Sequence, residues 1–162
     1  MKAAFLDRDS TLVRTFPQDG LPPRGPRTIE EIEYLPDVRE GCRLLRKAGY
    51  RLVCVTNQAD IARGIITAHS VELVDTELLS SIPLDAFYTC THQDSDGCGC
   101  RKPKPGLLYA AAYEMHLQLD GSVMIGDSDR DKGAANAAGV RFVRTDGTDF
   151  LECVRWIVSH SE

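Results

Sequence analysis

The chain has 162 residues, of which 43% are hydrophobic and 27% charged, and its formal net charge at pH 7 is −5. These values are typical of one globular domain, and the negative charge excludes a general electrostatic attraction to nucleic acid or to an acidic membrane. No stretch is long and apolar enough for a membrane span or a signal peptide. We therefore expect a single domain over residues 1–162 that is cytoplasmic and monomeric and binds neither nucleic acid nor membrane.

A predicted buried strand over residues 1–6 runs directly into two carboxylates, Asp7 and Asp9. Because side chains alternate along a strand, the two carboxylates point to the same side. Like charges this close repel each other, which raises a pKa or recruits a cation. A solvated turn is the alternative, since Asp, Ser and Thr also favour turns.

Residues 16–27 are rich in Pro and Gly and are predicted to form neither helix nor strand. A loop of this length in a compact domain is usually a lid or a binding loop, so we expect it to lie over the two carboxylates. Arg24 and Arg27 are its candidate anion contacts. A surface excursion without a function is the alternative.

The rest of the chain alternates between helices and strands. Helices are predicted over residues 37–48, 67–81, 105–117, 133–138 and 151–158, and strands over residues 50–56, 85–89, 122–126 and 140–143. Gly49 and Gly139 are placed to end helices, Thr67 to cap one and Pro105 to occupy a first helical position. This alternation predicts a doubly wound parallel α/β sheet, in which ligands bind at the carboxyl ends of the strands.

Polar residues follow three of the predicted strands: Asp7 and Asp9 the first, Thr56 and Asn57 the second, and Asp127 the strand over 122–126. Their convergence at one edge of the sheet predicts a site there. Three aspartates suit Mg²⁺, which prefers oxygen ligands and often shares them with a phosphate. One aspartate can then act as a nucleophile and another as a general acid and base.

Lys102 lies in a basic segment, residues 101–106, that leads into the amino terminus of a predicted helix. A lysine beside a phosphoryl group offsets its charge, and a hydroxyl such as that of Thr56 holds one of its oxygens. A basic loop on an acidic protein is the alternative interpretation of this segment.

These segments together resemble the four motifs of the haloacid dehalogenase (HAD) superfamily. The matching pieces, in the family's order, are Asp-x-Asp-x-Thr at residues 7–11, Thr56, Lys102 and Gly126-Asp127-x-x-x-Asp131. The resemblance implies a HAD-like Rossmannoid fold and makes Asp7 the nucleophile and Asp9 the acid and base. It assigns contacts with the phosphorylated substrate to Thr11, Thr56, Asn57 and Lys102. It assigns Mg²⁺ binding to Asp7, the backbone carbonyl of Asp9 and Asp127, with Asp131 in support.

A second candidate metal site lies in the loop over residues 90–100, which carries three cysteines and a histidine: Cys90, His92, Cys98 and Cys100. A Cys₃His set suits tetrahedral structural zinc, although the spacing is tighter than in a zinc finger. Reduced thiols without a metal are the alternative, but residues 93–97 include nothing apolar to order the loop. The other cysteines lie in apolar patterns and are expected in the core: Cys42, Cys54 and Cys153.

The zinc loop followed by Arg101 and Lys102 narrows the resemblance to the small phosphatases without a cap domain that act on D-glycero-D-manno-heptose 1,7-bisphosphate or on histidinol phosphate. Asn57-Gln58 and residues 61–64 favour the heptose enzymes. We expect a small phosphorylated sugar as the substrate, with Arg63 and Arg101 binding its second phosphate. The chain departs from the family at Ser10, where glycine is usual.

Three other functions stay open. A histidinol-phosphate phosphatase would need an extra acid near the loop, such as Asp19 or Asp60. A non-catalytic zinc-binding module that recruits a partner is disfavoured by the complete set of aspartates. A nucleic-acid 3′-phosphatase is disfavoured by the negative charge and by the lack of a basic stripe.

Overall fold

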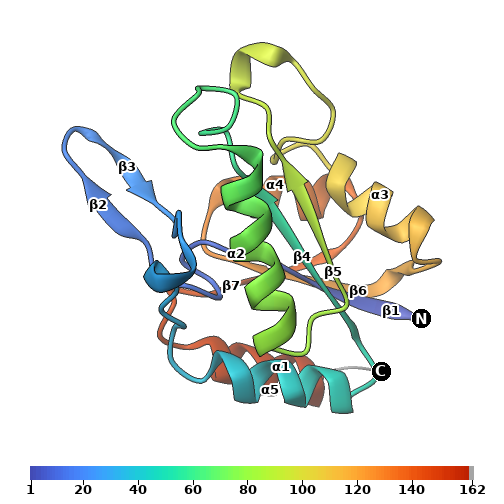
Figure 1. Ribbon diagram of the computed structural model, residues 1–162. Helices are drawn as coiled ribbons and strands as arrows, with labels where there is room; N and C mark the ends of the chain where they lie inside the picture. Colours follow the sequence, from blue (N-terminus) through green and yellow to red (C-terminus); the bar gives the residue numbers. More distant parts are fainter. Residues whose placement is uncertain (161–162) are drawn as a thin grey trace.

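A five-stranded parallel sheet forms the centre of the protein in the computed structural model, which describes residues 1–160 (Figure 1). The strand order is β5-β4-β1-β6-β7, and all four neighbouring pairs are parallel. The strands are β1 (Lys2–Leu6), β4 (Arg51–Asn57), β5 (Ala86–Cys90), β6 (Gln118–Gly126) and β7 (Arg141–Arg144). The strand that Asp7 follows is therefore the central one, as expected for a doubly wound sheet.

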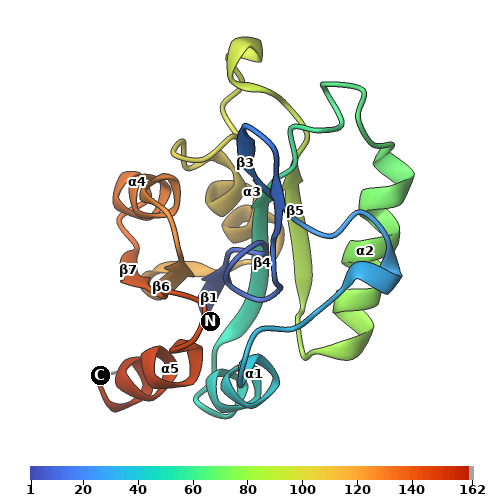
Figure 2. The same ribbon diagram turned by 90° about the vertical axis from the view of Figure 1, so that its left-hand side faces the viewer.

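Helices cover both faces of the sheet. One face packs against α1 (Val38–Lys47), α2 (Ala68–Ser81) and α5 (Phe150–Ser159), and the other against α3 (Gly106–Glu114) and α4 (Asp129–Ala137). Figure 2 shows α1 and α5 side by side below the sheet. Among residues 1–160, every helix is too short or too polar to cross a membrane.

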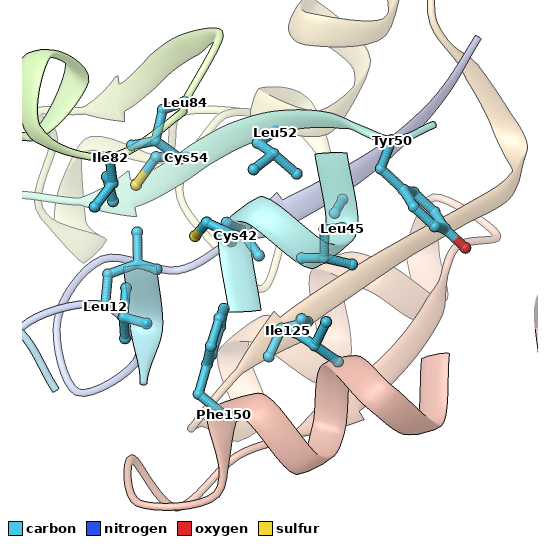
Figure 3. Close-up of a cluster of buried hydrophobic side chains, with 14 of the residues drawn as sticks. Leu12, Cys42, Leu45, Tyr50, Leu52, Cys54, Ile82, Leu84, Ile125 and Phe150 are labelled. Atoms are coloured by element: carbon cyan, nitrogen blue, oxygen red, sulfur yellow. The ribbon is translucent and has the colours of Figure 1, made fainter. Parts of the chain in front are cut away.

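Alternation along β1 fixes the direction in which its end points. Ala4 and Leu6 lie in the hydrophobic cluster under α1 and α5, while Ala3 and Phe5 lie in the cluster under α3 and α4. Figure 3 shows the first cluster, where Phe150 faces Ile125 and α1. Burying a leucine or phenylalanine side chain stabilises the fold by about 1.5–3 kcal/mol. Leu6 in one cluster and Phe5 in the other therefore hold β1 in a single register.

The prediction that residues 16–27 contain no strand is wrong. They form an antiparallel hairpin, β2 (Phe16–Gln18) and β3 (Leu21–Arg24), which projects from the sheet at its upper left in Figure 1. Gly20 turns the chain with φ at +66°. Prolines are tolerated here because a two-stranded ribbon has only edge strands, in which many N–H groups need no partner. The hairpin is followed by a 3₁₀ turn over Ile29–Glu31.

Three other predicted elements begin or end elsewhere. The helix predicted from residue 133 begins at Asp129, because Ser128 caps it and accepts a hydrogen bond from the Asp131 N–H. Pro105 lies at the cap of α3 rather than in its first turn, and α3 ends at Glu114, just before His116 turns left-handed. The strand predicted from residue 122 begins at residue 118. The remaining elements lie within one residue of their predicted bounds; the lack of a cap domain stays a prediction.

Candidate active site

The carboxyl ends of three adjacent strands open into one small cleft. Asp7 follows β1, Thr56 and Asn57 end β4, and Asp127 follows β6. The cleft has a volume of about 130 Å³. Its lining residues are Asp7, Asp9, Thr56, Asn57, Lys102, Ser128, Arg130 and Asp131. The structure therefore brings together the groups that the sequence predicted from separate segments.

Lys102 lies between two buried carboxylates. Its Nζ is 2.6 Å from Oδ1 of Asp7 and 2.6 Å from Oδ1 of Asp131, and it donates a third hydrogen bond to the Val55 carbonyl at 2.8 Å. All three charged side chains are almost inaccessible to solvent. The ammonium group thus offsets two negative charges that would otherwise repel each other in a dry environment.

Asn57 fixes the backbone of Lys102 in place. Its Oδ1 accepts from the Lys102 N–H at 3.0 Å, and its Nδ2 donates to the Lys102 carbonyl at 3.0 Å. The end of β4 therefore sets the position of the lysine, which is 45 residues away in the chain. Substrate binding by Asn57 stays a prediction, since the contacts present are with this backbone.

The acidic cluster of Asp7, Asp127 and Asp131 suits a hard divalent cation. Their carboxylates offer oxygen atoms that lie within 4.8 Å of one another. Burial raises the pKa of Asp7, although the neighbouring Lys102 ammonium acts in the opposite direction. Burial also raises the pKa of Asp127, and the charge of Asp131 raises it further. A bound Mg²⁺ would stabilise the ionised form of all three groups, so the donor set fits the expected metal.

The side chain of Asp9 lies outside the acidic cluster. Its Oδ1 accepts from Arg8 Nε at 2.9 Å, and its Oδ2 accepts from Gln58 Nε2, also at 2.9 Å. Gln58 donates a further bond to the Thr56 hydroxyl at 2.9 Å. The Asp9 side chain is therefore not part of the acidic cluster, and metal binding by the Asp9 backbone carbonyl, which the family resemblance implies, stays a prediction.

The segment after the hairpin packs directly on Asp9. A Cβ atom at Gly25 would collide with the Asp9 carboxylate, so only glycine allows the backbone to approach this closely. The expectation that this Pro-rich segment covers the paired carboxylates is therefore confirmed at Asp9. Thr11 is also buried, and its Oγ1 has no hydrogen-bond partner among residues 1–160.

A larger, cationic pocket adjoins the small cleft. It has a volume of about 530 Å³, lies between the hairpin and residues 57–66, and shares Asp9, Asn57 and Arg130 with the cleft. Five arginines line it: Arg24, Arg27, Arg63, Arg101 and Arg130. This combination of a buried acidic centre and an arginine-rich annex suits a substrate with two anionic groups.

Four of these arginines have a carboxylate partner. Arg24 pairs with Glu31 at 2.6 Å, and Arg101 pairs with Asp94 at 2.7 Å. Asp60 accepts from the other two, Arg27 at 2.9 Å and Arg63 at 3.3 Å. Among residues 1–160, Arg130 has no carboxylate within 4.0 Å of its guanidinium, which leaves its charge available to a ligand.

The Cys₃His residues form one compact cluster at the end of β5 and in the following loop. Sγ of Cys100 lies 3.3 Å from Sγ of Cys90 and 3.3 Å from Nδ1 of His92, and Sγ of Cys98 lies 3.8 Å from that of Cys90. Sulfur atoms around tetrahedral zinc, with Zn–S bonds of 2.3 Å, are about 3.8 Å apart. The four ligand atoms lie within 4.8 Å of one another, so the cluster is compatible with one Zn²⁺ ion.

Four contributors to the site were missed by the sequence analysis: Arg8, Gln58, Asp75 and Arg130. Gln58 directly follows the polar pair at the end of β4, so its position was a usable signal. Asp75 is a carboxylate next to the buried Val74 in α2, which is an unusual place for a charge. The roles of Arg8 and Arg130 depend on tertiary contacts that no local pattern contains.

The comparisons with known proteins agree on one family. Residues 99–148 match the HAD-hydrolase-like family. The chain is 35% identical over 150 residues to D-glycero-beta-D-manno-heptose-1,7-bisphosphate 7-phosphatase of Yersinia pestis, covering 85% of this chain and 76% of that protein. The chain belongs to this family of HAD phosphatases. The Escherichia coli K12 heptose bisphosphate phosphatase is equally similar, at 35% over 151 residues, with 85% and 75% covered.

Two solved structures share the fold. The enzyme from B. bronchiseptica, complexed with magnesium and phosphate, has a TM-score of 0.78 at 28% identity and covers 96% of this chain and 87% of its own. A HAD-like phosphatase from Mesorhizobium loti has a TM-score of 0.72 at 25% identity, with 97% and 87% covered. The predicted family, fold and enzyme class, a phosphoric monoester hydrolase, are thereby confirmed, and the neighbour's magnesium supports Mg²⁺ as a cofactor.

Proposed function

We propose that the protein is a Mg²⁺-dependent phosphatase that removes the 7-phosphate from D-glycero-D-manno-heptose 1,7-bisphosphate. The observation that carries the proposal is the buried Asp7–Lys102–Asp131 cluster beside a pocket lined by five arginines. The cluster suits the phosphoryl group that is transferred, and the pocket suits an additional phosphate. The names of the relatives at 35% identity support the same substrate.

The chemistry begins with attack of the Asp7 carboxylate on phosphorus. As the new O–P bond forms, the P–O bond to the sugar breaks, and the leaving oxygen takes a proton from the Asp9 carboxyl group. The ionised Asp9 then removes a proton from water, whose oxygen attacks the phosphorus of the aspartyl phosphate. Inorganic phosphate leaves, and Asp7 and Asp9 return to their starting states.

Other side chains stabilise the phosphoryl group during both steps. The Lys102 ammonium offsets its negative charge, and the Thr56 hydroxyl at the end of β4 donates to one of its oxygens. Mg²⁺, held by Asp7, Asp127 and the backbone of Asp9 with Asp131 in support, would neutralise charge so that an anionic nucleophile can approach an anionic phosphate. Ser128 keeps Asp131 in place through a 2.6 Å hydrogen bond to its Oδ2.

The second phosphate is assigned to the arginine-rich pocket. Arg63 and Arg101 are the contacts expected from the sequence, and Arg130 joins them because it lines both the cleft and the pocket. Asp60, one of the two candidate acids for histidinol phosphate, pairs with both Arg27 and Arg63. The excess of arginines over carboxylates in the pocket lining favours a second phosphate over the amine of histidinol phosphate.

Zinc is assigned a structural role. Cys90, His92, Cys98 and Cys100 would supply four protein ligands and so close the coordination sphere to substrate. The loop they form contacts the active-site segment, since Arg101 donates to the His92 carbonyl at 3.2 Å. Thiol ligands suit a reducing compartment, which supports the proposal of a cytoplasmic enzyme. A monomeric, single-domain enzyme that binds neither nucleic acid nor membrane stays a prediction from the sequence.

A substrate panel tests the proposal. Phosphate release would be measured, with and without Mg²⁺, from heptose 1,7-bisphosphate, histidinol phosphate, fructose 1,6-bisphosphate and a 3′-phosphorylated oligonucleotide. We expect the highest kcat/KM for the heptose bisphosphate and no release in EDTA. A preference for histidinol phosphate or the oligonucleotide would replace the proposed substrate. No release from any compound would favour the non-catalytic zinc module.

A further inference from the structure

Asp75 is a buried carboxylate that does not line the cleft. It lies on the buried face of α2 together with Val71, Val74 and Leu78, and it is 8% exposed. Its Oδ1 accepts from Arg8 Nη1 at 3.0 Å, and its Oδ2 accepts from the Thr89 hydroxyl on β5 at 3.0 Å. Both oxygens are therefore held, one by each neighbour.

Arg8 connects Asp75 to Asp9. The arginine is 1% exposed. Its guanidinium donates to Asp75 through Nη1, and to Asp9 through Nε at 2.9 Å and Nη2 at 3.3 Å. A continuous chain of charged hydrogen bonds thus runs from Thr89 through Asp75 and Arg8 to the acid and base of the proposed reaction.

This arrangement fixes the orientation of the Asp9 carboxylate. A guanidinium is planar, so anchoring one of its nitrogens on Asp75 sets the plane in which Nε and Nη2 meet Asp9. The burial of the arginine lowers the local dielectric constant, which strengthens each contact. Gln58 Nε2 and the Gly25 backbone confine Asp9 from its other sides.

We propose that Asp75 is a positioning residue for proton transfer by Asp9. The proposal rests on the proposed phosphatase function, in which Asp9 protonates the leaving oxygen. Asp75 holds Arg8, and Arg8 holds the Asp9 carboxyl group where the sugar oxygen departs. Without this anchor Arg8 follows Asp9 into other rotamers, and the proton is delivered less often along the P–O bond that breaks.

The dependence on the leaving group separates positioning from a merely structural role. A sugar alkoxide is strongly basic and needs the proton as its bond to phosphorus breaks, whereas 4-nitrophenolate leaves without one. The ratio kcat/KM reports the first transfer, to Asp7, for both kinds of substrate. We expect Asp75→Asn to lower kcat/KM for the best sugar phosphate by about tenfold and for 4-nitrophenyl phosphate by less than about twofold.

Two further variants keep the test decisive. Thr89→Val preserves every charge but removes one anchor of Asp75, and we expect a loss of about threefold that is again confined to the sugar phosphate. Glu72→Gln, the same carboxylate-to-amide change at an exposed position of α2, is the matched control and should leave kcat/KM unchanged for both substrates. If Asp75→Asn does not fold, the result for Thr89→Val alone tests the positioning role of Asp75.

Equal losses on the two substrates, or no loss, in the folded variants would overturn the positioning role. The Asp7→Asn variant shows whether the phosphatase proposal itself has failed. It should hydrolyse neither substrate, and retained hydrolysis in it would reject Asp7 as the nucleophile independently of Asp75.

Discussion

Nζ of Lys102 lies 2.6 Å from Oδ1 of Asp7, although 95 residues separate them in the chain. The same nitrogen is 2.6 Å from Asp131, so one buried cation serves two buried anions. Removing a single partner from such a group leaves charge without compensation, which is more destabilising than the pair itself is stabilising. The centre of the site is therefore coupled to the stability of the fold.

The first prediction concerns this lysine. Lys102→Met preserves most of the side-chain volume but leaves Asp7 and Asp131 without their cation, so we expect the free energy of unfolding at pH 7 to fall by about 3 kcal/mol. Lys132→Met, the same change at an exposed position of α4, should alter it by less than about 0.5 kcal/mol. Urea denaturation in EDTA measures both. Similar values for the two variants would show that the buried cluster does not depend on the lysine.

The second prediction concerns the strained backbone at Ser10. Ser10 has φ at +64°, a left-handed conformation that favours glycine, and glycine is usual at this position in the family. We expect Ser10→Gly to raise the thermal midpoint, with a gain of up to about 1 kcal/mol, despite losing the Oγ contact with Thr15 at 3.1 Å. Ser80→Gly, in the helix α2, should lower it. A lower midpoint for Ser10→Gly would mean that the contact with Thr15 outweighs the strain.

The third prediction concerns the zinc loop. Cys98→Ser removes one of four ligands, so zinc content and the free energy of unfolding should fall together, the latter by about 3 kcal/mol or more. Cys42→Ala removes a buried thiol from the core and should lower stability by about 1 kcal/mol with no change in zinc. Elemental analysis and denaturant melts distinguish the two. Equally stable, zinc-free wild-type protein would contradict a structural metal, and activity in the folded Cys98→Ser fraction should still require Mg²⁺.

The fourth prediction concerns recognition of the second phosphate. Arg63→Ala should raise KM for a bisphosphate about tenfold and for the matching monophosphate less than about twofold, because only the bisphosphate loses a charged hydrogen bond. Arg130→Ala should raise KM for both substrates, because Arg130 lines the cleft for the transferred phosphoryl group as well as the pocket. Arg14→Ala, whose side chain pairs with Glu33 away from the pocket, serves as the control. Equal changes in KM for both substrates in Arg63→Ala would remove Arg63 from the bisphosphate site.

The fifth prediction concerns the anchor of the hairpin. The pKa of Glu31 is lowered from its usual 4.5 to about 2, mainly by the hydrogen bonds that Arg24 donates to it; burial acts in the opposite direction. Because the pKa of Glu31 is depressed in the folded state, ionised Glu31 stabilises the fold above pH 4.5, and this stabilisation is lost as the pH falls toward 2. Glu31→Gln should therefore be less stable than the wild type by up to about 1 kcal/mol at pH 7, with the gap narrowing from pH 4.5 to pH 3. A constant gap across this range would contradict the ion pair as its source.

Much of the fold was predictable because its signals are local. The alternation of apolar runs and capping residues located every helix and strand of the parallel sheet, and the polar residues after β1, β4 and β6 located its functional edge. The hairpin was not predictable, because its prolines and glycines favour a loop unless β2 and β3 pair with each other. Pairing of this kind is a property of the folded chain rather than of either short segment.

The position of the candidate site was predictable where spacing along one segment matters, as for Asp7 after β1 or the cluster of Cys90, His92, Cys98 and Cys100. It was not predictable where a partner lies far away in the chain. Nothing near residue 8 in the sequence indicates that Asp75 anchors Arg8 across 67 residues. The ion pairs of the pocket arginines are also set by tertiary contacts. Only the structure shows that Arg130 has no carboxylate partner among the residues it describes.

The most direct test of the proposed function is phosphate release from D-glycero-D-manno-heptose 1,7-bisphosphate by the wild type and Asp7→Asn side by side in Mg²⁺. Asp7→Asn keeps the shape of the nucleophile but removes its charge. We predict that the wild type releases one phosphate per sugar and leaves the 1-phosphate in place, while folded Asp7→Asn releases none. Undiminished release by Asp7→Asn, or no release by the wild type, would contradict the account.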